Sequence, residues 1–164
     1  MRLKIHHTIG KKVCSELKES GLYIHEELFL LGNLFPDLIH SYFWRRHEYK
    51  HSREYFRKKL DMVKKRPILL SFHLGVLSHY ICDYFCYPHS TCYGEGLIQH
   101  IIYEIRQKVP KDYCKLNMSN LTFSIDNLDK LVEWYSLFRA AFFDDESDFH
   151  IAANVTFSFL QAAL

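Results

Sequence analysis

Residues 74–89 read LGVLSHYICDYFCYPH, and this stretch decides how the rest of the chain is interpreted. His79 and Asp83 are four residues apart in a segment with helical periodicity, so both side chains lie on one helix face, one turn apart. Apolar neighbours such as Phe72 and Val76 share that face, which predicts that the pair points into the protein. A buried carboxylate needs a partner, and a metal ion is one of the few adequate ones.

A second pair of the same kind follows downstream. Pro88 predicts the end of the helix and His89 comes directly after it, while His100 and Glu104 repeat the four-residue spacing. One such pair is more often a hydrogen bond on a helix surface than a metal site. Two pairs, with further His and Asp residues upstream, favour a metal centre between helices.

Composition narrows the class of protein. The chain has 164 residues, enough for one domain with a hydrophobic core, and 48% hydrophobic with 24% charged residues fits a globular protein. A net charge of only +2 gives no reason to expect a nucleic-acid-binding protein. The 11 histidines are unusually many for this length and supply metal ligands.

The cysteines and the N-terminus indicate a reducing compartment. The five cysteines are odd in number and form no CxxC pair, which favours packed thiols over a disulfide framework. Cys82 and Cys86 are spaced to bind zinc, but they point away from the face of His79. No apolar leader begins the chain, and no apolar run reaches the length of a membrane span. We therefore expect a cytoplasmic location.

The periodicity predicts helices only, in one all-α domain of five to seven helices spanning residues 1–164. The expected helices cover about residues 6–20, 22–31, 47–65, 67–86, 96–108, 126–142 and 146–163. Gly21 and Gly32 should end the first two helices, and residues 33–36 should form a turn. Asp37, which follows that turn, suits the N-cap of the next helix as well as it suits a metal site.

These residues together resemble the zinc-dependent phospholipase C family, whose fold is shared by the fungal single-strand-specific zinc nucleases. Residues 74–89 carry the closest match, with His89 at the family's spacing from Asp83. His100-x-x-x-Glu104 matches the second motif. Upstream, residues 32–37 read GNLFPD and are followed by His51, which resembles the Asp and His that complete the first site. The resemblance covers roughly residues 5–106.

The resemblance implies two zinc ions, and a third in its fullest form. One ion would be held by Asp37, His51, His79 and Asp83. Another would be held by His89, His100 and Glu104. The third would use His6 and the second oxygen of Asp83. Imidazole and carboxylate ligands suit zinc and leave room for water.

Two ligand assignments stay open, and the N-terminus departs from the family. His47 is an alternative to His51, and His7 is an alternative to His6. In the secreted phospholipases the terminal amine of the mature chain is itself a zinc ligand. Here Met1 lies five residues before His6, which argues against the third ion.

The implied activity is zinc-dependent hydrolysis of a phosphodiester, as in phospholipase C, with Asp37 as general base. A phospholipid substrate and transient contact with a membrane surface would follow. The alternative is a nuclease for single-stranded nucleic acid, for which the aromatic and basic residues 42–46 would provide stacking and charge. A non-catalytic metal-stabilised helical protein is less favoured, because structural zinc sites are usually closed by four protein ligands.

Overall fold

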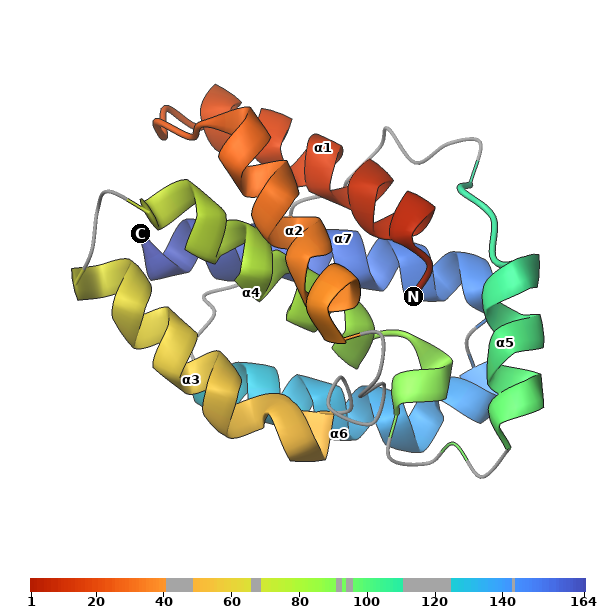
Figure 1. The fold of residues 1–164 in the computed structure, drawn as a ribbon. Coiled ribbons are helices and arrows are strands. Elements are labelled where there is room, and N and C mark those ends of the chain that lie inside the picture. The colour runs from red at the N-terminus through yellow and green to blue at the C-terminus, as the bar shows by residue number, and fades with distance from the viewer. Residues whose placement is uncertain (41–48, 66–68, 91–92, 94–95, 111–124, 143) are drawn as a thin grey trace.

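Helix α4 (Leu70–Tyr84) runs through the middle of the protein and is buried along nearly its whole length (Figure 1). The computed structural model describes residues 1–40, 49–65, 69–90, 93, 96–110, 125–142 and 144–164. Four helices surround α4: α1 (Leu3–Glu19), α2 (Glu26–His40), α3 (Tyr49–Lys65) and α7 (Asp145–Ala163). His79 and Asp83 on α4 are therefore removed from water, as the pattern of the stretch predicted.

Three shorter or more peripheral elements complete the fold. They are the 3-10 turn η3 (Tyr87–His89), α5 (Leu97–Arg106) and α6 (Ile125–Phe142). Within the described residues all regular structure is helical, which confirms the predicted fold class. No helix in this part of the chain is long and apolar enough to cross a lipid bilayer. His47, residues 42–46 and the expected helix start at Pro67 lie outside the described residues.

The hydrophobic core confirms the predicted face of the first helix. Ile9, Val13 and Leu17 on α1 are fully buried, and His6 lies one turn earlier on the same face. The helix ends as expected, since Gly21 adopts a φ of +90°, a conformation that favours glycine at a helix C-terminus.

The predicted turn at residues 33–36 is wrong, because α2 continues from Glu26 to His40 without a break. Gly32 does not end the helix, Pro36 lies inside it, and Asp37 is not an N-cap. The glycine serves packing instead: a Cβ at Gly32 would lie 2.0 Å from the carbonyl oxygen of Phe72 on α4. Tertiary contact between helices thus overrides the local signals that normally stop one.

A pair of glycines sets how closely α2 and α4 approach. Gly32 on α2 meets the backbone of α4, and Gly75 on α4 meets the backbone of α2, where a Cβ would lie 2.0 Å from the carbonyl oxygen of Phe29. Both positions admit no side chain without moving backbone. This close crossing brings Asp37 on α2 to His79 on α4, so the glycines determine the geometry of the candidate site.

We expect Gly75→Ala to destabilise the protein by about 3 kcal/mol or more, since the added methyl group meets backbone that cannot move cheaply. Gly96→Ala is the matched control, because its nearest neighbour is the Gln99 side chain at 3.5 Å; it should cost less than about 1 kcal/mol. Urea unfolding of both variants, free of metal, measures the difference. Equal and small losses would show that the α2–α4 crossing tolerates a side chain.

Candidate metal centre

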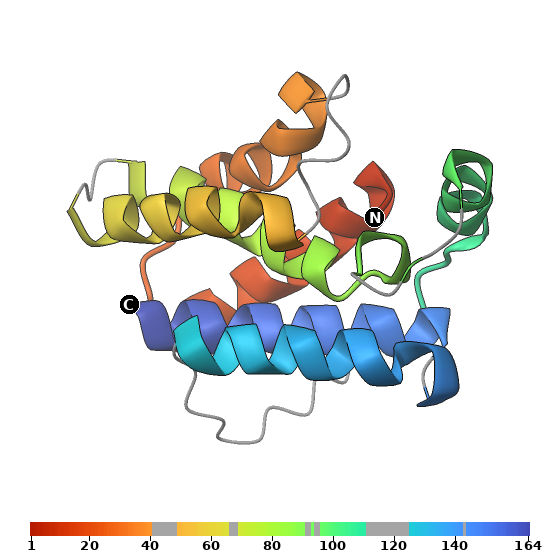
Figure 2. The ribbon, with the colours of Figure 1, turned by 90° about the horizontal axis from the view of Figure 1, so that it is seen from below.

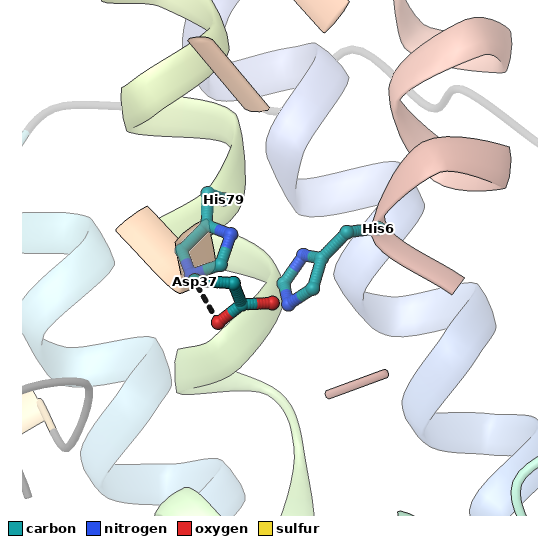
Figure 3. A group of neighbouring side chains, drawn as sticks. All are labelled: His6, Asp37 and His79. Carbon is teal, nitrogen blue, oxygen red and sulfur yellow. Dashed lines mark ion pairs between the residues drawn. The ribbon is translucent and has the colours of Figure 1, made fainter. Parts of the chain in front are cut away.

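The first group of candidate ligands comes from three helices. His6 on α1, Asp37 on α2 and His79 on α4 each direct one nitrogen or oxygen to a common point, with these atoms within 4.8 Å of one another (Figure 3). His79 Nε2 lies 3.6 Å from Asp37 Oδ1. The rings of His6 and His79 stack with their centroids 4.0 Å apart. The two histidines are fully buried, whereas Asp37 is one quarter exposed.

The second group comes from η3 and α5. His89 follows Pro88 in the 3-10 turn, and His100 and Glu104 lie one turn apart on α5. His100 Nε2 lies 3.3 Å from Glu104 Oε1, and His89 Nε2 lies 4.0 Å from the same oxygen. The structure therefore brings together the three residues that the family resemblance implied as one ion site.

Asp83 lies between the two groups and contacts both. Its Oδ2 lies 3.2 Å from His79 Nε2, and its Oδ1 lies 3.1 Å from His6 Nε2. The same Oδ1 lies 3.8 Å from His89 Nε2 in the second group. Asp83 is thus placed so that its two oxygens can serve neighbouring metal ions.

A hydrogen bond to the backbone fixes the orientation of the His79 ring. Its Nδ1 lies 2.9 Å from the backbone carbonyl oxygen of Asn33 on α2, and because a carbonyl can only accept, Nδ1 carries the hydrogen. In a neutral ring the lone pair on Nε2 then faces the carboxylates of Asp37 and Asp83. That arrangement is repulsive unless a cation lies among the three groups, which fits a bound metal.

The amino group of Met1 reaches the same centre, which sequence reasoning missed. It donates to Asp83 Oδ1 at 2.9 Å and lies 3.0 Å from His89 Nε2 and 3.2 Å from Glu104 Oε1. The sequence predicted no such role for the Met1 amine, because Met1 lies five residues before His6. In the structure the amine nevertheless points into the protein, toward Asp83. An ammonium group therefore lies against Asp83 and two members of the second group.

Charge at the centre holds the carboxylates ionised. Burial by itself would raise the pKa of Asp83, but the positive charge of the Met1 amino group is the largest influence that holds that pKa well below its usual value. Burial likewise opposes ionisation of Glu104, and hydrogen bonds from His100 and His89 lower its pKa. Both carboxylates are therefore charged at neutral pH and available as ligands.

Burial keeps two of the imidazoles neutral. The pKa of His6 falls to about 4 because the ring is desolvated and lies against His79. The pKa of His89 also falls to about 4, because it is desolvated and lies beside the Met1 amino group. A neutral imidazole offers the lone pair that a metal requires, so both rings are competent ligands at pH 7.

The remaining predicted ligand, His51, lies outside both groups. It is in the first turn of α3 with an exposed side chain. The alternative ligand His47 lies outside the described residues, so whether His51 or His47 is the ligand stays a prediction. His7 is half-buried on α1 and is not part of either group, whereas His6 is.

The cysteine alternative finds no support among the described residues. Cys82 and Cys86 are fully buried, and neither belongs to a group of candidate ligands. Burial raises the pKa of the Cys82 thiol to about 12 and raises that of Cys86 as well. Both thiols are therefore protonated and packed.

A buried polar network supports the second group from the C-terminal helices. Asp148 on α7 is fully buried and accepts hydrogen bonds from Tyr135 and Arg139 on α6. It also accepts one from Tyr103 on α5, with 2.5 Å between Tyr103 Oη and Asp148 Oδ2. Because Tyr103 lies between His100 and Glu104 in sequence, this bond anchors the helix that carries both. No local sequence signal identified this network.

The described residues define an all-helical fold with two neighbouring groups of His, Asp and Glu side chains that could hold metal ions. Residues 5–144 match the family described as zinc-dependent phospholipase C, so the chain belongs to that family. The match reaches beyond the motifs and includes α6. No curated protein and no solved structure gives a significant match. The family's name implies zinc as the metal, and the nitrogen and oxygen donors fit it.

Removing the hydroxyl of Tyr103 should loosen the second group. We expect Tyr103→Phe to weaken zinc binding there by about tenfold, because residues that orient metal ligands typically contribute that much. Tyr23→Phe is the control, since Tyr23 is almost fully exposed. Competition with a chromogenic chelator measures affinity. Unchanged affinity in Tyr103→Phe would mean that His100 and Glu104 are positioned without Asp148.

The metal-free protein should lose stability as pH falls below 6.5. The pKa of His6 is 6.5 in the unfolded chain and about 4 when folded, so between these values only the unfolded state binds the proton. The loss should be on the order of 3 kcal/mol by pH 4 for His6 alone. Urea unfolding at pH 7, 6, 5 and 4 measures it, with His6→Gln as the control that should show a shallower slope. Parallel slopes would contradict a neutral, buried His6.

Proposed function

We propose that this protein is a zinc-dependent phosphodiester hydrolase that cleaves a phospholipid on the diacylglycerol side of its phosphate. One observation carries the proposal: in a member of this family, Asp83 contacts both groups of zinc-competent ligands. Two ions that share a carboxylate are close enough to act on one phosphodiester. The family supplies the expectation of a lipid substrate.

The charges of the residues fit divalent cations. Asp37, Asp83 and Glu104 bring three carboxylates to the centre, while His6 and His89 are neutral at pH 7. The Met1 amino group contributes a single positive charge. Bound zinc would supply the remaining positive charge, lower the pKa of water and stabilise the charge that develops on the phosphoryl oxygens.

Asp37 is the best-placed proton acceptor of the three carboxylates. Asp83 is 1% exposed and engaged on both oxygens, so it is unable to reach a reacting group. Glu104 is 28% exposed but is held by His100, His89 and the Met1 amino group. Asp37 is 25% exposed and lies at the outer edge of the cluster, where it can meet both the buried ligands and a substrate.

We further propose how the ions are shared. His79, Asp37 and Asp83 would hold one ion, with His51 or His47 completing the set, and His89, His100 and Glu104 would hold another. His6, Asp83 Oδ1 and the Met1 nitrogen, once deprotonated, form a set for a third. Because the Met1 amine is protonated in its contact with Asp83, a third ion would have to displace that proton.

The nuclease alternative gains nothing from the described residues, since the aromatic and basic stretch 42–46 lies outside them. A purely structural metal site is disfavoured by Asp37 and Glu104, which are both partly exposed and leave the ligand cluster accessible. Phospholipid hydrolysis remains the proposal because the family name supplies this substrate.

The zinc-loaded protein should cleave p-nitrophenyl phosphorylcholine, and Asp37→Asn should lower kcat by about a hundredfold or more through loss of the base. Asp61→Asn, an exposed carboxylate on α3, is the matched control and should retain full activity. A chelator should abolish turnover and added zinc should restore it. Elemental analysis of the same preparation should find at least two zinc ions per chain.

Two results would contradict the proposal. One is a protein that holds less than one zinc ion per chain after expression with added zinc. The other is chelator-sensitive cleavage of single-stranded DNA or RNA that is faster than cleavage of any phospholipid, which would favour the nuclease.

A further inference from the structure

Helix α5 has an inverted amphipathic pattern. Its isoleucines at the spacing i, i+3, i+4 and i+7 form one stripe, and all four side chains are between 40% and 69% exposed: Ile98, Ile101, Ile102 and Ile105. The opposite face carries His100, Tyr103 and Glu104, which point to the metal centre and to Asp148. In a typical surface helix the apolar stripe is the buried one. Here the polar face is buried and the apolar stripe faces outward.

A second apolar edge lies across the metal centre. Leu38 and Ile39 directly follow Asp37 and are more than half exposed. Figure 2 shows the C-terminal end of α2 and helix α5 on the same side of the molecule, away from α6 and α7. The partly exposed carboxylates of Asp37 and Glu104 belong to these two helices. Apolar side chains therefore flank the candidate ligands on two elements.

Positive charge accompanies the stripe. Arg106 at the end of α5 and Lys108 just beyond it are exposed. Arg2 is exposed too, and its guanidinium donates to the carbonyl oxygen of Ile105 at 3.1 Å. Apolar side chains bordered by Arg and Lys suit the boundary between lipid headgroups and acyl chains, where such a helix is buried by roughly 5–10 Å. The bordering cations complement the phosphates of the headgroups.

The size of the patch disfavours a protein partner. A helix of ten residues is roughly 15 Å long. Its stripe offers on the order of a few hundred Å² of apolar surface. A stable contact between two proteins buries roughly 800 Å² on each partner. Contact with a membrane needs no such area from a single helix, because several weak anchors add together.

We propose that the isoleucine stripe of α5, together with Leu38 and Ile39, docks the protein on a lipid surface and places the metal centre at that surface. This inference rests on the proposed function, since it explains how a phospholipid reaches Asp37 and Asp83. It adds the surface that makes the contact. The docking requires the apolar side chains and does not require catalysis.

The test compares two double variants of the zinc-loaded protein. Ile98→Gln/Ile105→Gln removes the most exposed part of the stripe. Leu69→Gln/Leu137→Gln replaces two exposed leucines elsewhere, one at the N-cap of α4 and one on α6. Co-sedimentation on ice with phosphatidylcholine vesicles, with and without phosphatidylserine, measures membrane partitioning. Turnover of the soluble p-nitrophenyl phosphorylcholine measures the site itself, and analytical ultracentrifugation measures self-association.

The α5 variant should partition about tenfold more weakly than the wild type, while the control variant partitions normally. Both should cleave the soluble ester within twofold of the wild-type rate. Wild-type protein that ignores vesicles, or equal losses in both variants, would overturn the docking surface. A wild-type dimer that only the α5 variant abolishes would also overturn it. Vesicle binding without any ester cleavage would leave the docking surface standing and remove the proposed function.

Discussion

The buried carboxylate of Asp83 is the constraint on which the rest of the structure depends. A charge at 1% exposure is unfavourable unless opposite charge and hydrogen bonds surround it. The protein brings His6, His79, His89 and the Met1 amino group to its two oxygens. These groups come from three separate elements and from the chain terminus, so satisfying one carboxylate fixes how α1, α4 and η3 meet.

Two different kinds of interaction position the helices around that carboxylate. On one side, Gly32 and Gly75 let α2 and α4 approach until backbone meets backbone, which brings Asp37 and the Asn33 carbonyl to His79. On the other side, Asp148 collects hydrogen bonds from α5 and α6. Close packing orients the first group of ligands, and a buried polar network orients the second. A substitution that disturbs the glycine contact should therefore affect the first group more than the second, and one that disturbs the Asp148 network should do the reverse.

Much of the candidate site could be predicted from the sequence, because candidate ligands on helices recur at regular spacings. The four-residue intervals at His79/Asp83 and His100/Glu104 predicted two helix faces that carry such residues. Spacing fails where the contact is tertiary. Gly32 and Pro36 commonly end helices, yet α2 continues through both. Gly32 packs against the backbone of Phe72 on another helix, and the sequence of α2 alone does not show that contact.

Two further features could not be predicted for related reasons. The amino group of Met1 is brought to Asp83 across 82 positions in the chain, and the sequence offered only its distance from His6. Asp148 and Tyr103 are ordinary residues for a helix and belong to no motif. Their roles come from the partners that folding supplies. Residues placed by helix periodicity can thus be identified from the sequence, whereas residues placed by long-range contacts can be identified only in the three-dimensional structure.

Helix α5 carries both candidate metal ligands and the exposed isoleucine stripe. Among the described residues it has few packing contacts with the rest of the protein, and its inner face is occupied by His100, Glu104 and Tyr103. Its attachment therefore depends on polar groups such as the Tyr103–Asp148 hydrogen bond, and a bound metal ion would add to the free energy that fixes it. A helix held in this way can leave its apolar side chains outside. One orientation of α5 therefore does two things: it turns the candidate ligands His100 and Glu104 inward, and it leaves the isoleucine stripe exposed.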